Sequence, residues 1–217
     1  MDFSTARYNM VESQIRPNGI TNVELISALA EIERENFVPD ARKAVSYADE
    51  DLQVGNDRFL LEPMVLGRLL QMAEIKESDL VLDVGPATGY STAVISKLAE
   101  SVVGIEQDTA LCEQAGDTLL EMGIANAAII CGEHVKGVAS EAPFDVIVLN
   151  GRVSEVPQAL FDQLEEGGRL VGVVGDKYLA KATVYTKDKG QMVSHSVFDA
   201  SALALSGVET PKASFQF

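Results

Sequence analysis

The stretch Asp79–Asp108, DLVLDVGPATGYSTAVISKLAESVVGIEQD, decides the fold of this chain. Its first apolar run, residues 80–84, is too short for a helix and predicts a buried strand. A turn-forming cluster over residues 83–89 follows, and residues 90–98 then carry apolar side chains at helical spacing. A second short apolar run, closed by Glu106, predicts another strand. In such a strand–loop–helix–strand unit a ligand lies across the strand ends, and an acid at the tip of the second strand can bind ribose hydroxyls.

The glycine spacing of this turn indicates which ligand fits. The dinucleotide fingerprint G-x-G-x-x-G needs its second glycine so that the backbone can approach a pyrophosphate. Here Ala87 takes that position, Pro86 adds bulk, and Gly89 follows Gly85 by four residues rather than five. The D-x-G-x-x-x-G spacing is similar to the first motif of the S-adenosylmethionine (AdoMet) methyltransferases, in which the glycines make room for the amino acid end of the cofactor. We expect AdoMet ahead of NAD, and a turn that needs small residues only for packing stays open as an alternative.

Composition and charge indicate an ordinary soluble domain. With 217 residues, 47% of them apolar and 23% charged, the chain has room for one substantial core. Its formal net charge of −16 repels a phosphate backbone, so we expect no nucleic-acid partner. No apolar run has the length of a membrane span, so no membrane is expected either. The N-terminal residues MDFSTARYNMVESQIRPN do not resemble a secretory signal, which favours a cytoplasmic location.

The cysteines and histidines predict neither a disulfide nor a metal site. Cys112 lies in a predicted helix and Cys131 in a predicted strand. We interpret both as small core residues, because an intracellular chain rarely keeps a structural disulfide. His134 and His195 are far apart in the sequence and lack the spacing of metal ligands, so no zinc site is predicted.

Outside the central stretch, strands and helices alternate and the order ends in a hairpin. Residues 1–50 are predicted to form a helical cap, in which Thr21 and Glu24 make a capping box. A turn-rich loop over residues 53–63 leads into a helix that begins at Pro63, a favoured first helical residue. The other predicted elements are helices at residues 111–119 and 157–164, strands at 127–131, 146–149 and 169–174, and a hairpin at 182–198.

This order predicts an α/β fold of the Rossmann-like AdoMet methyltransferase type. Its sheet is expected to be mostly parallel, with an antiparallel C-terminal hairpin and an N-terminal helical cap. We expect one domain over residues 1–217. Within it, residues 1–62 form the cap and acceptor loop, residues 63–175 the AdoMet-binding core, and residues 176–217 the hairpin and tail.

Over most of its length the chain resembles the protein-L-isoaspartate O-methyltransferases. The glycine loop carries part of the likeness, and segments outside the generic fold carry the rest. These segments are Met10-Val11-Glu12 with Arg16, Glu35-Asn36-Phe37-Val38-Pro39, Tyr47-Ala48-Asp49, Ala142-Pro143-Phe144-Asp145, Glu155-Val156-Pro157 and Gly167-Gly168-Arg169-Leu170-Val171. The resemblance implies an enzyme that uses AdoMet to methylate the abnormal carboxylate of isoaspartyl residues in proteins or peptides, which starts their repair through a succinimide.

Carried over position by position, the resemblance assigns residues to the cofactor. Glu106 would accept hydrogen bonds from both ribose hydroxyls, and Glu133 would lie near the adenine amino group, where the family usually has Asp. The alternative for both is an ordinary solvated acid at a strand end. The other expected cofactor residues are Asp83, Gly85, Thr88 and Gly89 at the methionine end, together with Pro86, Gln107 and Asn150.

The acceptor loop departs from the family pattern. Where the family has a loop of the type Gly-Gln-Thr-Ile-Ser-Gln-Pro, this chain has Asp57-Arg58-Phe59-Leu60-Leu61-Glu62-Pro63. Phe59 and Leu61 thus replace the Thr and Ser that lie beside the transferring methyl and the acceptor carboxylate in the family. A Thr-Ala-Ala-Ala stretch is also changed, to Asn150-Gly151-Arg152-Val153. Hydroxyls are therefore lost on the acceptor side, while the cofactor side is nearly intact.

Methyl transfer to a carboxylate tolerates such a loss in principle. The carboxylate is already ionised at neutral pH, so no general base is needed and catalysis can come from alignment. We take Arg58, Phe59 and Leu61 as the acceptor-side candidates. Arg58 and Arg152 carry guanidinium groups that can grip a carboxylate, although the simpler interpretation makes both of them surface arginines. Three functions stay open: an isoaspartyl methyltransferase, a methyltransferase with another, small and apolar acceptor, and a protein that binds AdoMet without turnover.

Overall fold

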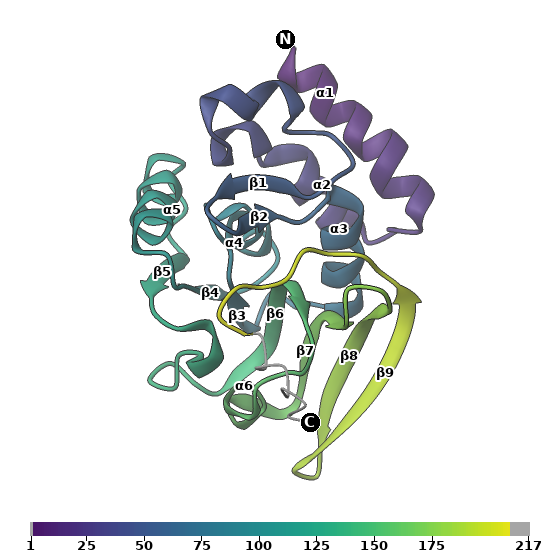
Figure 1. Cartoon of the computed structure of the whole chain (residues 1–217), viewed down its shortest axis with the longest axis vertical. Helices are drawn as coiled ribbons and strands as arrows, with labels where there is room; N and C mark the ends of the chain where they lie inside the picture. Colours follow the sequence, from purple (N-terminus) through teal and green to yellow (C-terminus); the bar gives the residue numbers. More distant parts are fainter. Residues whose placement is uncertain (1, 209–217) are drawn as a thin grey trace, which may run out of the picture.

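A seven-stranded sheet in the order β5-β4-β3-β6-β7-β8-β9 forms the centre of the molecule (Figure 1). The computed structural model describes residues 2–208. Strands β5, β4, β3, β6 and β7 run parallel, and β8 and β9 continue the sheet antiparallel. The strands are β3 (Leu80–Val84), β4 (Ser101–Glu106), β5 (Ala127–Cys131), β6 (Phe144–Val153), β7 (Leu164–Gly175), β8 (Ala180–Asp188) and β9 (Gln191–Asp199). The predicted fold class, including its antiparallel hairpin, is confirmed.

Alternate residues of the central strands face two separate hydrophobic cores. Val81 of β3 and Val146 of β6 belong to one core, whereas the neighbouring Leu82 and Ile147 belong to the other. Both faces of these strands are therefore buried, which explains their nearly continuous apolar sequence. The helices that cover the sheet are α3 (Pro63–Ala73), α4 (Tyr90–Ile95), α5 (Thr109–Glu121) and α6 (Gln158–Asp162), with a short turn η5 (His134–Lys136). In the described part of the chain, no helix combines the length and the apolar character needed to cross a membrane.

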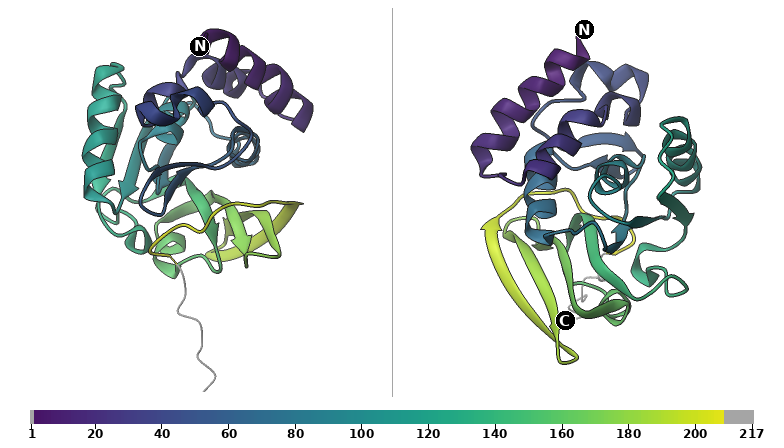
Figure 2. Two further views of the ribbon diagram at one scale, coloured as in Figure 1. Left: turned by 45° about the horizontal axis from the view of Figure 1, so that its top comes forward. Right: turned by 180° about the vertical axis from the view of Figure 1, so that it is seen from behind.

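The N-terminal third forms the predicted helical cap on the first of these cores. Figure 2 shows α1 and α5 on opposite sides of the molecule. The capping box is wrong by one residue: Asn22 caps α2 by accepting a hydrogen bond from the Leu25 amide at 2.7 Å. The Thr21 amide instead donates to Gln71 on α3. The elements of the cap are α1 (Phe3–Met10), η1 (Val11–Ile15), η2 (Arg16–Asn18), α2 (Val23–Glu31), η3 (Arg34–Phe37) and η4 (Asp40–Val45).

A short hairpin stands where the sequence predicts a turn-rich loop. Strands β1 (Leu52–Gly55) and β2 (Arg58–Leu60) pair antiparallel, and Asp57 turns the chain with a left-handed φ of 54°. Alternate residues of β1 are buried, as expected of a strand that packs one face on a core. The hairpin fixes the position of Arg58 at the start of β2, so that this side chain points inward.

Residues 200–208, which we call the C-terminal strap, return from β9 across the carboxyl ends of the parallel strands (Figure 1). The strap is held by backbone hydrogen bonds in both directions with Arg152 of β6. The Leu203 amide also donates to the Asp51 carboxylate at 2.8 Å. Residues 209–217, the last part of the predicted hairpin-and-tail segment 176–217, lie outside the described residues. The predicted division into three segments stays a prediction.

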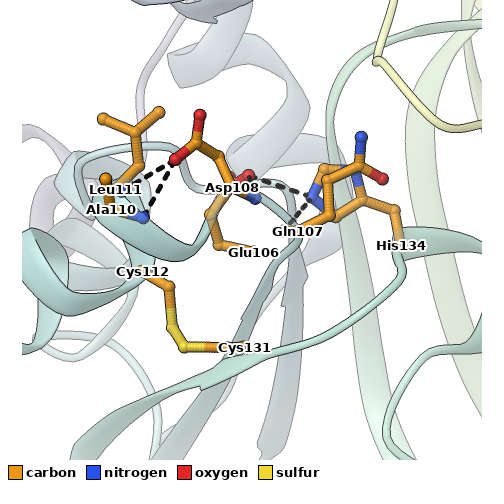
Figure 3. The surroundings of a disulfide bond; sticks show 8 residues. All are labelled: Glu106, Gln107, Asp108, Ala110, Leu111, Cys112, Cys131 and His134. Atoms are coloured by element: carbon orange, nitrogen blue, oxygen red, sulfur yellow. Dashed lines mark hydrogen bonds and ion pairs between the residues drawn. A yellow bond between two sulfur atoms is a disulfide. The ribbon is translucent and has the colours of Figure 1, made fainter.

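Cys112 and Cys131 form a disulfide, so the interpretation of both as thiols in the core is wrong. The bond joins α5 to the end of β5, and Cys131 is exposed while Cys112 is buried. Figure 3 shows the bond next to Glu106 and Asp108, at the end of β4. The helix and strand assignments for the two residues were right. The pairing depends on how α5 packs on β5, which the spacing of two cysteines does not reveal.

We predict that the double variant C112A/C131A is less stable by about 3 kcal/mol, since the disulfide closes a loop with a sequence separation of 19 residues. Urea unfolding of both proteins measures this difference. As a control, dithiothreitol must destabilise the wild type and leave the double variant unchanged. Equal stability, or two alkylatable thiols in the unreduced native protein, contradicts the prediction.

Candidate active site

Three polar side chains meet at the carboxyl edge of the sheet. Asp83 is the last residue but one of β3, Glu106 ends β4, and Asn150 lies near the end of β6. All three strands are parallel neighbours, so their carboxyl ends share one edge. This is the place where open α/β sheets bind their ligands. The sequence predicts all three residues as cofactor contacts, and that role stays a prediction.

Asp83 is enclosed by hydroxyl and amide groups of its own chain. Its side chain is fully buried and accepts hydrogen bonds from Ser91 and Thr92 of α4, both at 2.7 Å. The side-chain amide of Asn150 donates to its other oxygen. Burial raises the pKa of Asp83, and these three hydrogen bonds oppose that rise. Asp83 therefore ties β3, α4 and β6 together at the base of the site.

The glycine loop folds as a tight turn that opens α4. Gly85, Ala87 and Gly89 all have left-handed φ angles, of 73°, 53° and 96°. Such angles suit glycine, and Ala87 is a strained exception among them. The hydroxyl of Thr88 donates to the Phe37 carbonyl at 2.6 Å, so it faces the cap. Pro86 is buried beneath the acceptor loop.

The Glu106 carboxylate has all its acceptor positions filled by the protein. One oxygen accepts from Arg58 Nε at 3.1 Å and from the Asp108 amide at 3.0 Å. The other accepts from Arg58 Nη2 at 2.7 Å and from the Ala87 amide at 2.9 Å. A carboxylate offers about four lone-pair positions, so none remains free. Glu106 is fully buried, which excludes the alternative of a solvated strand-end acid.

The charge of Glu106 is firmly held. Burial alone would raise the pKa of this carboxyl group, but the neighbouring His134 ring and the Arg58 guanidinium outweigh burial and lower the pKa to about 2. Arg58 and Glu106 form a buried ion pair with two parallel hydrogen bonds, the strongest geometry available to Arg and a carboxylate.

Arg58 is the main surprise of the site, because the simpler interpretation as a surface arginine is wrong. Only 2% of the residue is exposed, and Nη2 also donates to the Gly85 carbonyl at 2.7 Å. The guanidinium is therefore committed to the cofactor side. Arg152 is half-buried, and its guanidinium donates to the carbonyl oxygens of Ala202 and Gly175.

His134 belongs to the site, although the sequence singles it out only as an unlikely metal ligand. It is fully buried, with Nε2 3.4 Å from a Glu106 oxygen and 3.2 Å from the Gln107 amide. Its Nδ1 lies 2.9 Å from the Ser206 carbonyl of the strap. The one available signal was its position shortly after the end of β5 at Cys131. Its neighbour Glu133 is exposed and pairs with Lys136, outside the cluster.

The acceptor loop encloses almost no space. Leu61 is buried and Phe59 is half-buried. With Pro86, Tyr90 and Asn150 they line a cavity of about 10 Å³. That volume holds about one water molecule. The two residues that replace the family's hydroxyls thus fill the space between the glycine loop and β2.

Two acids, Glu62 and Asp51, lie next to the acceptor loop. Glu62 follows Leu61, and burial together with nearby Asp49 and Asp51 raises the pKa of Glu62 to about 7. Asp51 accepts from the Glu62 amide at 2.9 Å as well as from the strap, and burial raises its pKa. An approaching carboxylate therefore meets negative charge here at alkaline pH.

The residues expected for AdoMet are present, and in this structure side chains of the chain itself fill the space beside them. Arg58 occupies the two Glu106 positions that the sequence assigns to the ribose hydroxyls. A Cβ built on Gly85 would lie 2.5 Å from Leu205 Cδ1 and 2.9 Å from Arg58 Nη2, so the space above that glycine is filled. A hollow of about 530 Å³ lies instead beside the strap, between Asp51 and Tyr178.

Comparison with known proteins confirms the resemblance. The family model described as protein-L-isoaspartate(D-aspartate) O-methyltransferase (PCMT) matches residues 6–207. A protein-L-isoaspartate O-methyltransferase of Koribacter versatilis is 36% identical over 205 residues, which cover 94% of this chain and 92% of that protein. One from Methanoculleus marisnigri is 33% identical over 186 residues, with 86% and 84% covered.

Solved structures support the same relationship. A protein-L-isoaspartate O-methyltransferase superposes with a TM-score of 0.83 at 25% identity, over 94% of this chain and 67% of that chain. A second structure, titled a putative protein-L-isoaspartate O-methyltransferase from Plasmodium falciparum in complex with S-adenosyl-L-homocysteine, has a TM-score of 0.76 at 19% identity, over 95% and 99%. The second likeness shows the fold alone.

We predict that the Arg58–Glu106 pair makes stability fall in acid. The pKa of Glu106 is lowered in the folded state, so its contribution is complete above the unfolded value of about 4.5 and is lost as pH falls towards about 2. Urea unfolding across this range should show a steeper loss in the wild type than in E106Q. At neutral pH, E106Q should be destabilised by about 3 kcal/mol or more, because Arg58 stays buried without a counter-charge. Parallel pH profiles for the two proteins contradict this.

Proposed function

Because the chain belongs to the protein-L-isoaspartate O-methyltransferase family, we propose that it transfers a methyl group from AdoMet to the carboxylate of isoaspartyl residues in proteins or peptides. Enzymes of this family use AdoMet as the methyl donor. The observation that carries the proposal is the carboxyl edge of the sheet. There Asp83, the glycine loop and Glu106 lie together, and they are the residues that the resemblance assigns to the cofactor. Glu133 and Gln107 are proposed to approach the adenosine from the end of β5 and the end of β4.

The acceptor side supports this chemistry with few groups. An isoaspartyl carboxylate is ionised at neutral pH, so the protein has only to hold it in line. Leu61 and Phe59 have no hydroxyl with which to do so, and Arg58 and Arg152 already donate to other groups. We therefore expect slow turnover that keeps the preference for the isoaspartyl form.

A second candidate function is favoured by the closed acceptor loop. A cavity of about 10 Å³ behind Phe59 and Leu61 admits no acceptor group. A family member that has kept the fold as a binding protein, without isoaspartyl methylation, fits this observation. An acceptor other than the isoaspartyl residue is the remaining possibility on the acceptor side.

We propose that the substrates are proteins or peptides in the cytoplasm. The high negative charge of the chain argues against a nucleic-acid partner. The Cys112–Cys131 disulfide is the observation that argues against a cytoplasmic location, since such bonds are rare in the cytosol of mesophiles. Thiol alkylation in rapidly acidified cells, followed by mass analysis, reports its state in the cell. A bond that is always oxidised there counts against the cytoplasmic proposal.

The proposed function predicts selective labelling of an isoaspartyl peptide. Methyl transfer from labelled AdoMet is measured on this peptide and on the same peptide with a normal aspartyl residue. We expect label in the first and background in the second. Equal labelling of both peptides removes the preference for the isoaspartyl form and leaves a methyltransferase with another acceptor. No labelling in a preparation that binds S-adenosylhomocysteine (AdoHcy) leaves the second candidate.

We predict that L61S raises kcat/KM on the isoaspartyl peptide by about tenfold. One hydrogen bond to a charged group is worth about 1.5–3 kcal/mol, and 1.4 kcal/mol corresponds to a factor of ten. The matched control is L66S, which adds a hydroxyl to the same cavity from α3. If L66S gives the same gain, or L61S gives none, the hydroxyl position has no special role in this chain.

A further inference from the structure

We propose that this chain carries its own occupant of the cofactor site: Arg58 and Leu205 close it, and adenosyl ligands bind only when both are displaced. The inference rests on the proposed function, because it concerns the cofactor side of the same site. Three sets of contacts carry it, and they come from β2, from the strap and from the anchors of the strap.

The first set consists of the hydrogen bonds that Glu106 accepts, for which Arg58 and a ribose would compete. Two of its four acceptor positions hold backbone amides, of Ala87 and Asp108, and these cannot leave without unfolding the glycine loop or the start of α5. The other two hold Nε and Nη2 of Arg58. A ribose diol also brings two donors. Arg58 therefore occupies the pair of positions that a ribose would need, and the two cannot bind Glu106 together.

The second set concerns space. Leu205 is fully buried, and its Cδ1 lies over Gly85, where a close approach to the backbone is open only to a residue without a Cβ. Leu205 also packs against Gly151, where an added Cβ would lie 3.0 Å from Leu205 Cβ. Leu205 belongs to the same hydrophobic core as Val84 and Leu149, which lie near the ends of β3 and β6. The glycine loop thus receives a leucine side chain in the space that a ligand would use.

The third set holds the strap in place. The Leu205 amide donates to the Arg152 carbonyl at 2.8 Å, and the Leu203 amide donates to Asp51. His134 contacts both the strap, at the Ser206 carbonyl, and Glu106. The strap and the Arg58–Glu106 pair therefore share a neighbour, so that movement of one disturbs the other.

This arrangement predicts that adenosyl ligands such as AdoHcy bind the wild type with a high apparent dissociation constant. When only a fraction of the molecules has an open site, the apparent dissociation constant rises by the inverse of that fraction. Removing either occupant increases the open fraction and tightens binding, without a new contact to the ligand. The arginine stands where the family loop has Gln, so R58Q restores the family residue and keeps an amide that can donate to Glu106.

The test is calorimetric titration of AdoHcy into the full-length wild type, R58Q, L205A and the double variant. The expected result is that each single variant lowers the dissociation constant at least about tenfold, which corresponds to a closed population of about nine-tenths or more. Two matched controls keep the wild-type value: R42Q, at an exposed arginine of the cap, and L203A, at a leucine of the same strap that is 44% exposed.

Several results overturn the proposal. They are a wild type that binds AdoHcy as tightly as R58Q and L205A, a control variant that tightens binding equally, and no binding by any of the proteins. If R58Q does not fold, L205A alone decides, because it leaves the ion pair in place. If the variants bind AdoHcy tightly but do not methylate an isoaspartyl peptide, the proposed function is rejected and this inference is not.

Hydrogen exchange gives an independent readout on the wild type. Saturating AdoHcy should accelerate exchange of the Leu205 amide, since the strap has to leave Arg152. A ligand that entered beside an intact strap would slow this exchange or leave it unchanged, and either outcome rejects displacement.

Discussion

The buried ion pair between Arg58 and Glu106 is the interaction on which the site depends. It joins the β1–β2 hairpin to the end of β4, and through Nη2 of Arg58 it also reaches the Gly85 carbonyl of the glycine loop. A charge removed from water at such a position is stable only with a partner, so each member fixes the other. The cap, the glycine loop and the sheet are thereby held in one arrangement.

Much of this fold is readable from the sequence, because its strands are buried on both faces. Continuous apolar runs such as residues 80–84 have few other interpretations, and the break in helical spacing at the glycine loop marks the carboxyl edge. The errors are local or depend on tertiary packing. Asn22 rather than Thr21 caps α2 because the helix begins one residue later, and the Cys112–Cys131 bond depends on how α5 packs on β5.

For the candidate site too, the sequence predicts positions but not tertiary contacts. Sequence alone places Asp83, Glu106 and Asn150 at strand ends, and the parallel sheet brings these ends to one edge. It does not reveal what those side chains touch. The interpretation of Arg58 as a surface residue fails because a single arginine in a polar loop carries no signal of burial. Its partner lies 48 residues away in sequence. The strap is equally invisible, since residues 200–208 have no periodicity that predicts a docking position.

If the chain's own residues occupy the place of its ligand, a crystal structure of the AdoHcy complex must show them displaced. In that complex we expect the ribose hydroxyls to bind Glu106, the Arg58 guanidinium to have left Glu106, and Leu205 to lie no longer over Gly85. A complex in which AdoHcy is bound while Arg58 still holds both Glu106 oxygens and Leu205 still covers Gly85 would contradict this expectation.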